Sequence, residues 1–203
     1  GTNGTVTGDI IYVDAKTDSA LNTYTGKFKG KFVMLGDPRD IKAHFEPEAT
    51  RLADSSLLKM ANADVPQSFS RRGMREQTPE QKMRALVEYR KLEMCQKEGA
   101  AGILTIARGD VGNIFVQGAS VPMHPDTPFT KRVSAYDNKA PKLLPQIAVG
   151  AEHYNRLVRM IQKGEHPKLQ MNLDVEFSKA DSVANIIAEL PGTDLKDEVV
   201  MIG

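Results

Sequence analysis

Four histidines and a single cysteine are the side chains of this 203-residue chain best suited to bind a transition metal. A zinc site needs three or four His, Cys or carboxylate ligands, commonly with two of them close together in the sequence. His44, His124, His153 and His166 are widely separated, and none forms a His-x-His or His-Glu-x-x-His pair. We therefore expect all four to be surface or lightly packed histidines, and we expect no metal or other cofactor in this chain.

Cys95 is a candidate nucleophile by residue type, because a thiolate beside a base can attack a carbonyl carbon. It falls, however, on the apolar stripe of a predicted helix, where a cysteine packs as a small apolar side chain. The chain has no Gly-x-Ser-x-Gly nucleophile motif, phosphate-binding loop or dinucleotide-binding fingerprint. Residues 109–112 predict a strand connection, and Arg-Gly-Asp at 108–110 and Asn-Gly-Thr at 3–5 predict ordinary turns. We expect no catalytic residue here.

Arg71 and Arg72 are the candidate binding residues, since they form a basic pair in a polar segment with Pro66 and Gly73 nearby. Paired guanidinium groups on a loop can hold a peptide carboxylate through bidentate hydrogen bonds. The alternative is a loop whose charges only keep the surface soluble. Both interpretations place residues 62–77 in an exposed loop.

The composition excludes several classes of partner. There are 27 Lys and Arg against 26 Asp and Glu, so the formal net charge is 27 − 26 = +1. This balance gives no electrostatic reason to expect nucleic acid as a partner. No stretch approaches the roughly 20 apolar residues of a membrane-spanning helix. The single cysteine excludes an internal disulfide and leaves the compartment open.

The first half of the chain predicts strands at residues 9–14 and 31–35, which are short β-branched and aromatic runs flanked by Gly or Asp. Residues 47–60 have helical spacing of apolar side chains, with Pro47 suited to a first turn. A stronger helix signal begins at Thr78, where Thr-Pro-Glu-Gln fits a capping box with Pro at the first helical position. Its apolar stripe runs through Ala85, Tyr89, Leu92 and Cys95, and Gly99 is placed to end it.

The second half predicts strands at residues 101–107 and 113–117, followed by an exposed excursion at 118–142 that contains four prolines. A strand is expected at 144–149 and an amphipathic helix at 151–163. Residues 168–177 alternate polar and apolar side chains, which indicates a half-buried strand. Helices alternating with strands in this way favour an α/β fold with mixed sheets flanked by helices.

Residues 182–203 contain two apolar runs, 183–190 and 199–202, separated by Pro191, Gly192 and a charged segment. This pattern predicts two strands joined by a tight connection. The run Val-Val-Met-Ile is apolar on both faces, as expected for a strand buried between helices. We expect the chain to be a fragment that breaks off as it enters a second domain.

These last residues resemble the beginning of a catalytic domain in a known peptidase family. Residues 185–192 (Asn-Ile-Ile-Ala-Glu-Leu-Pro-Gly) and 198–203 (Glu-Val-Val-Met-Ile-Gly) resemble the di-zinc aminopeptidases and carboxypeptidases, the M-twenty-eight metallopeptidases. In that family the next residues are a Gly or Ala and then His-x-Asp, the first zinc ligands. The resemblance implies a zinc exopeptidase parent with two zinc ions, exported to the periplasm or medium, and no peptidase activity in this chain alone.

A second resemblance covers most of the remaining chain. Residues 30–35 (Gly-Lys-Phe-Val-Met-Leu), 97–104 (Lys-Glu-Gly-Ala-Ala-Gly-Ile-Leu) and 144–149 (Leu-Pro-Gln-Ile-Ala-Val) resemble, in that order, the protease-associated domain, a β/β/α (swivelling) module attached to peptidases. This implies a protease-associated domain at residues 1–178 and the incomplete start of the peptidase domain at 179–203. Such a module caps or flanks the active-site cleft, so Arg71, Arg72 or the 118–142 excursion is expected to face peptide substrate.

Two other function classes stay open. A free-standing peptide- or protein-binding module would use the same loops without enzymatic linkage, although the apolar terminal run argues against a self-contained module. A small enzyme with an unrecognised site is the third class, and an aminopeptidase assay with added zinc separates it from the other two.

Overall fold

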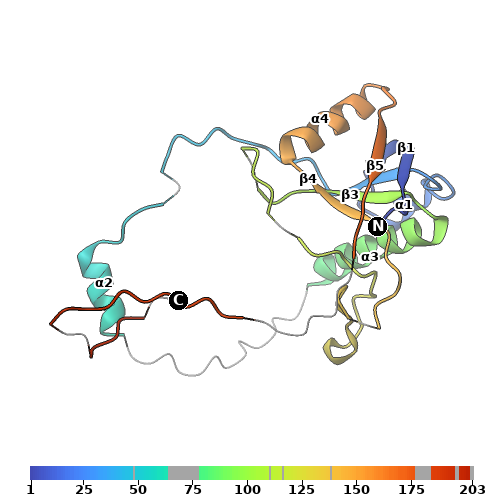
Figure 1. Cartoon of the computed structure of the whole chain (residues 1–203). Coiled ribbons are helices and arrows are strands. Elements are labelled where there is room, and N and C mark those ends of the chain that lie inside the picture. Colours follow the sequence, from blue (N-terminus) through green and yellow to red (C-terminus); the bar gives the residue numbers. More distant parts are fainter. Residues whose placement is uncertain are drawn as a thin grey trace.

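The computed structural model describes residues 1–47, 49–63, 78–109, 111–115, 117–137, 139–176, 184–194 and 197–201. Its centre is a five-stranded sheet with the strand order β4-β3-β2-β1-β5 (Figure 1). The first four strands run parallel, and β5 is antiparallel to β1. The strands are β1 Thr5–Tyr12, β2 Phe32–Leu35, β3 Gly102–Ile106, β4 Gln146–Val149 and β5 Lys168–Asn172. The predicted mixed α/β class is confirmed.

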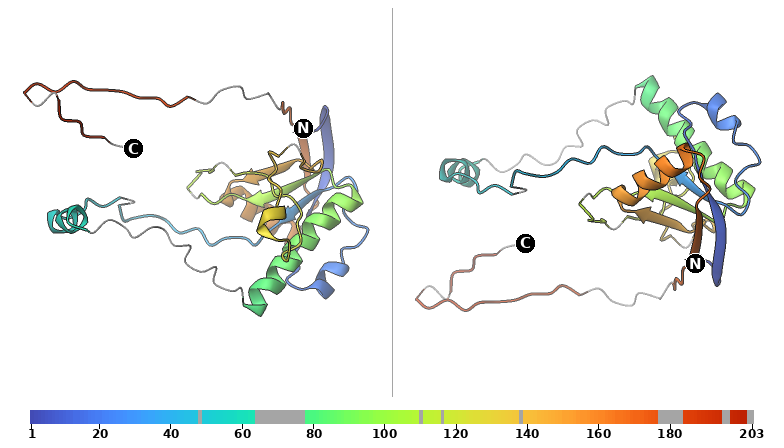
Figure 2. Two further views of the ribbon diagram at one scale, coloured as in Figure 1. Left: turned by 90° about the horizontal axis from the view of Figure 1, so that it is seen from below. Right: turned by 90° about the horizontal axis from the view of Figure 1, so that it is seen from above.

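Helices cover both faces of this sheet. The long helix α3 (Pro79–Glu98) and the short helix α1 (Asp18–Asn22) lie on one face, and α4 (Ala151–Gln162) lies on the other (Figures 1 and 2). The central strand β2 is buried along its whole length. Its Val33 and Leu35 pack with Cys95 of α3, whereas Phe32 and Met34 pack with the α4 side chains. A continuous apolar run is therefore needed at β2, because both of its faces are covered.

Helix α3 begins and ends as its sequence predicts. The Thr78 hydroxyl accepts from the Gln81 N–H at 3.2 Å, and the Gln81 side chain accepts from the Thr78 N–H at 3.0 Å. Gly99 ends the helix in the left-handed conformation, with φ 71°. Of the predicted stripe, Cys95 is buried and Leu92 packs against the same core, whereas Ala85 and Tyr89 are only half-buried. The other fully buried positions are Val87 and Lys91, which the prediction did not include. The aliphatic part of a lysine side chain can pack on the core while its ammonium group reaches the edge of that core. A prediction that considers only apolar residues therefore misses this position.

Two predicted elements near the middle of the chain need correction. The predicted helix at 47–60 begins only at Asp54, as α2 (Asp54–Ala61), and none of its residues is buried. The described residues of the predicted strand at 113–117 contain no strand, and Ile114 and Phe115 are exposed. The described residues of this run pair with no strand, not even with the open edge of β4, and a strand needs such a partner.

The strand predicted at 168–177 is shorter in the structure, where β5 ends at Asn172. Its partner β1 begins at Thr5, after a turn with positive φ at Asn3 and Gly4. After Asn172 the chain is held by Thr2 instead of by strand pairing. The Leu173 N–H donates to the Thr2 hydroxyl at 2.8 Å. The predicted apolar face is confirmed for Leu169, Met171 and Leu173, which pack on the α4 side of the sheet.

The predicted strands near the carboxyl terminus are absent from residues 184–194 and 197–201. This segment extends away from the sheet (Figure 1), and Ile186 and Leu190 are 99% and 98% exposed. A strand is stable only when its N–H and C=O groups pair with a neighbouring strand. The apolar pattern is present here, but the described part of the chain supplies no such neighbour.

Candidate functional site

Charged side chains gather where β1 and β2 end, at the carboxyl edge of the parallel strands. Asp14 and Lys16 follow β1, and Gly36 and Asp37 follow β2. Because β1 and β2 are parallel neighbours, their carboxyl ends meet at one edge of the sheet. Open α/β sheets bind ligands in crevices at this edge.

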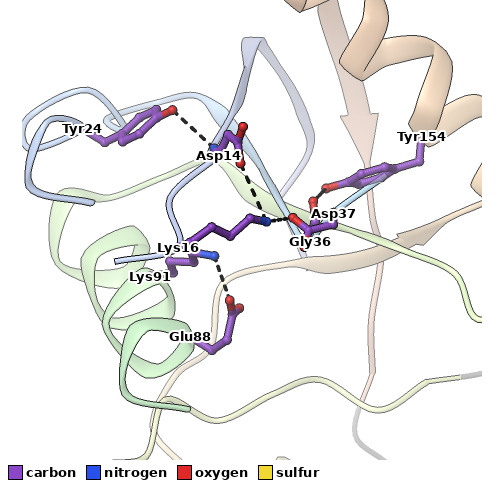
Figure 3. Close-up of polar contacts among 8 residues, drawn as sticks. All are labelled: Asp14, Lys16, Tyr24, Gly36, Asp37, Glu88, Lys91 and Tyr154. Atoms are coloured by element: carbon purple, nitrogen blue, oxygen red, sulfur yellow. Dashed lines mark hydrogen bonds and ion pairs between the residues drawn. The ribbon is translucent and has the colours of Figure 1, made fainter. Parts of the chain in front are cut away.

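An ion-pair cluster joins the two strand ends. The Lys16 ammonium group contacts the Asp37 carboxylate and lies 3.7 Å from an oxygen of Asp14 (Figure 3). All three side chains are more than half exposed, so water screens these pairs and each contributes little to stability. Their effect is to hold charges of both signs over the sheet edge.

Two tyrosines hold the backbone below this cluster. The Tyr154 hydroxyl, reaching through from α4, donates to the Gly36 carbonyl at 3.0 Å, and the Tyr24 hydroxyl accepts from the Asp14 N–H at 3.3 Å (Figure 3). Gly36 has φ 106°, a conformation that a side chain would strain, which allows the chain to turn before Asp37. Burial raises the pKa of Tyr154 well above its usual range, so its hydroxyl stays a donor.

Lys91 of α3 is the most unusual side chain of the site, because it is buried and charged. Its side chain is 3% exposed, and its ammonium group donates to the Glu88 carboxylate at 2.7 Å (Figure 3). Within the described residues Glu88 is its only partner, although an ammonium group has three N–H donors. Buried donors without acceptors are costly. The remaining donors therefore need oxygen atoms from water or from a ligand.

These elements enclose a groove of about 640 Å³ between the sheet edge and one face of α3. Met83 and Val87 give it an apolar wall. The charged lining residues balance, with three basic side chains and three acidic ones. The lining is Lys16, Gly36, Asp37, Glu80, Met83, Arg84, Val87, Glu88 and Lys91. Such a surface suits a small ligand that carries polar groups and an apolar side chain.

The sequence-predicted binding residues do not contribute to this description. Arg71 and Arg72 lie outside the described residues. The excursion at 118–142 is largely exposed, as predicted, and its described residues have only one 3₁₀ turn, Phe129–Lys131. It packs along α3 through His124, whose ring meets Tyr89 edge-on with 5.4 Å between centroids.

The histidines and the cysteine lie as the sequence predicts. All four histidines are exposed. Cys95 is fully buried, and burial raises the pKa of its thiol to about 12, which excludes a thiolate nucleophile near neutral pH. Within the described parts of the chain, no three His, Cys, Asp or Glu side chains lie close enough to hold a metal ion.

The Arg-Gly-Asp tripeptide serves a local packing role through its first two residues. The Arg39 guanidinium group donates to the carbonyls of Arg108 and Gly109. The Arg39 backbone also exchanges two hydrogen bonds with the Asn155 amide of α4, at 3.1 and 2.6 Å. These contacts tie the segments after β2 and β3 to α4, and this turn is therefore part of the framework around the sheet edge.

Sequence reasoning missed the groove, although two signals were present. An aspartate stands two residues after the end of each of the strands β1 and β2, at Asp14 and at Asp37. In α3, Lys91 lies four residues from both Val87 and Cys95, so it falls on their buried face. Lysine is almost never buried without a partner, so a lysine in the middle of a buried stripe indicates a polar site beside it.

No described helix is both long and apolar enough to cross a bilayer. Comparison with models of protein families, with curated proteins and with solved structures gives no significant match for this chain.

Proposed function

We propose that this chain is the non-catalytic protease-associated domain of a zinc-dependent exopeptidase, joined to the first residues of the catalytic domain. The observation that carries the proposal is the exposure of the carboxyl-terminal apolar runs. Ile186, Leu190 and Val200 are each more than 90% exposed. Contiguous exposed apolar side chains are typical of surfaces that another protein region covers. The peptidase catalytic domain of the same polypeptide is the partner we assign to them.

The order of the elements supports the same proposal. The three segments that resemble the protease-associated domain fall on β2, on the junction of α3 with β3, and on β4 before α4. They lie in one sheet as adjacent parallel strands, with β3 between β2 and β4. A resemblance spread over separate segments is stronger when those segments form one packed unit.

In this proposal the two zinc ions and their ligands belong to the catalytic domain, and this chain influences which peptides reach them. Arg71 and Arg72 and the excursion at 118–142 remain the candidate surfaces that face the substrate. The parent enzyme would be exported to the periplasm or medium, as the resemblance implies.

A free-standing peptide-binding module is the second candidate, and the groove beside α3 favours it. That groove combines a buried lysine with apolar and charged walls inside residues 1–203 alone. The two candidates predict different coding sequences beyond residue 203.

Sequencing the coding region beyond Gly203 tests the proposal directly. We expect a Gly or Ala followed by His-x-Asp within the next few residues, and further Asp, Glu-Glu and His ligands over roughly the next 150 residues, a typical domain length. A stop codon, or a continuation without these ligands, would contradict a peptidase parent and leave the binding module as the function.

A further inference from the structure

We infer that the groove beside α3 binds a small apolar carboxylate that also carries an N–H group, such as an amino acid or the last residue of a peptide. This inference concerns the described groove residues, which follow β1 and β2 or lie on α3, and it holds with or without a peptidase domain beyond residue 203. Its anchor is Lys91, whose buried ammonium group faces the groove with donors that Glu88 does not use.

The carboxylate assignment comes from what Lys91 lacks. The Lys91 side chain is 3% exposed, and one half-exposed carboxylate is the only acceptor of its ammonium group among the described residues. A ligand oxygen would satisfy a second donor through a short charge-assisted hydrogen bond. Arg84 lies two helical turns from Lys91 on the same face and also lines the groove. On this wall Arg84 and Lys91 alternate with Glu80 and Glu88, so the two cations suit a single carboxylate rather than a more highly charged anion.

The remaining lining selects the rest of the ligand. Asp37 and Glu88 offer acceptors for the N–H group, and Met83 and Val87 provide apolar surface for a side chain. Inorganic phosphate would meet the cations but would leave this apolar surface in water and would be repelled by the acidic side chains. The mixed lining therefore fits an α-amino acid unit better than a simple anion.

Nuclear magnetic resonance titration of the full chain tests this inference. The probes are N-acetyl-leucine, which resembles a peptide carboxyl terminus, and free leucine. Leucinamide, which lacks the carboxylate, and inorganic phosphate are the controls. We expect one or both carboxylates to shift the methyl signals of Met83 and Val87, and leucinamide and phosphate to leave them unchanged. The relative strength of the first two probes then separates a peptide ligand from a free amino acid.

Two variants of α3 connect any binding to the buried ammonium group. Lys91→Met keeps the aliphatic stem and removes the donors, so affinity should fall at least about tenfold, the loss of one charge-assisted hydrogen bond. Lys97→Met is the matched control on the same helix, because Lys97 is 71% exposed and pairs with Glu93. It should bind like the parent chain. Arg84→Gln, at an exposed position, gives a second reduction without a risk to folding.

Three outcomes would overturn the inference. They are no shift with either carboxylate, equal binding of leucinamide, and binding of phosphate in preference to both. Unchanged affinity in both Lys91→Met and Arg84→Gln would also overturn it. Because every measurement uses residues 1–203, failure here is independent of the sequence beyond residue 203.

Discussion

At the scale of single residues, two side chains of α3 show how burial changes chemistry. Lys91 and Cys95 lie one turn apart on the same buried face. The ammonium group of Lys91 reaches the edge of the core and donates a hydrogen bond to Glu88, whereas the thiol of Cys95 packs among apolar side chains. One becomes a candidate anchor for a ligand, and the other becomes chemically inert.

The raised pKa of Cys95 predicts a pH dependence of stability. In the unfolded chain a thiol has a pKa of about 8.5, and burial raises the pKa of Cys95 in the folded protein to about 12. Below the lower value both states hold the proton. Between the two values only the folded state holds it, so the free energy of unfolding falls by about 1.4 kcal/mol for each pH unit. Stability is therefore lost as the pH rises.

Urea unfolding from about pH 8 to about pH 11 measures this loss, with Cys95→Ala as the control that lacks the thiol. Tyrosines and lysines affect both proteins equally, so the difference in stability between them should shrink as the pH rises. Parallel curves over this range would contradict a buried thiol at Cys95.

At the scale of elements, helix α3 connects the fold to the groove. Its amino-terminal half lines the groove, and its carboxyl-terminal half packs against β2 and β3. Glu98 at its end accepts from the N–H groups of Gly26 and Phe28, at 2.8 and 3.0 Å. The end of the helix therefore also holds the connection between α1 and β2.

The helix end at Gly99 gives a prediction for stability. Gly99 has φ 71°, and an added Cβ would meet nothing within 4 Å, so Gly99→Ala adds backbone strain without a steric clash. We expect a loss of about 1–2 kcal/mol in the free energy of unfolding, measured by urea denaturation. Gly118→Ala is the control, because its Cβ would make ordinary contact with Tyr136 at 3.6 Å. It should change stability by less than about 0.5 kcal/mol, and an equal loss in both variants would refute the strain argument.

At the scale of the whole molecule, two segments project from the α/β body. The segment after β2 leads to α2, and the segment after residue 183 carries the terminal apolar runs. Figures 1 and 2 show both extending to the same side of the body. Leu58 and Met60 of α2 are largely exposed, like the terminal runs. The sheet itself is completed by strands from both sides of the first segment.

This arrangement predicts that the chain tolerates a cut between β2 and α2. Trypsin should cleave first at exposed sites such as Lys42 and Arg51, because extended surface segments are the preferred sites of proteolysis. The two pieces should remain associated, since β2 pairs with β3 and β1 pairs with β5 across the cut. Gel filtration under native conditions should give one peak with an unchanged far-ultraviolet circular dichroism spectrum. Separate peaks, or first cuts within α3 or α4, would contradict this.

Elements with local signals could be predicted from the amino-acid sequence. The capping box at Thr78, the left-handed glycine at position 99 and the amphipathic helix α4 depend on residues within a few positions of one another. Strands β2, β3 and β4 were equally readable, because short apolar runs between turn residues describe buried parallel strands. These elements also carried the prediction of an α/β fold.

The tertiary structure decides which apolar runs pair as strands and which charged side chains come together at one site. Residues 113–115 and 184–190 have strand-like patterns, yet pairing requires a neighbouring backbone that no local pattern reveals. The groove likewise joins residues after β1 and β2 to a helix more than forty positions further along the chain. Lys91 becomes buried only when α3 packs on the sheet, because burial is a property of the packed fold rather than of the residue.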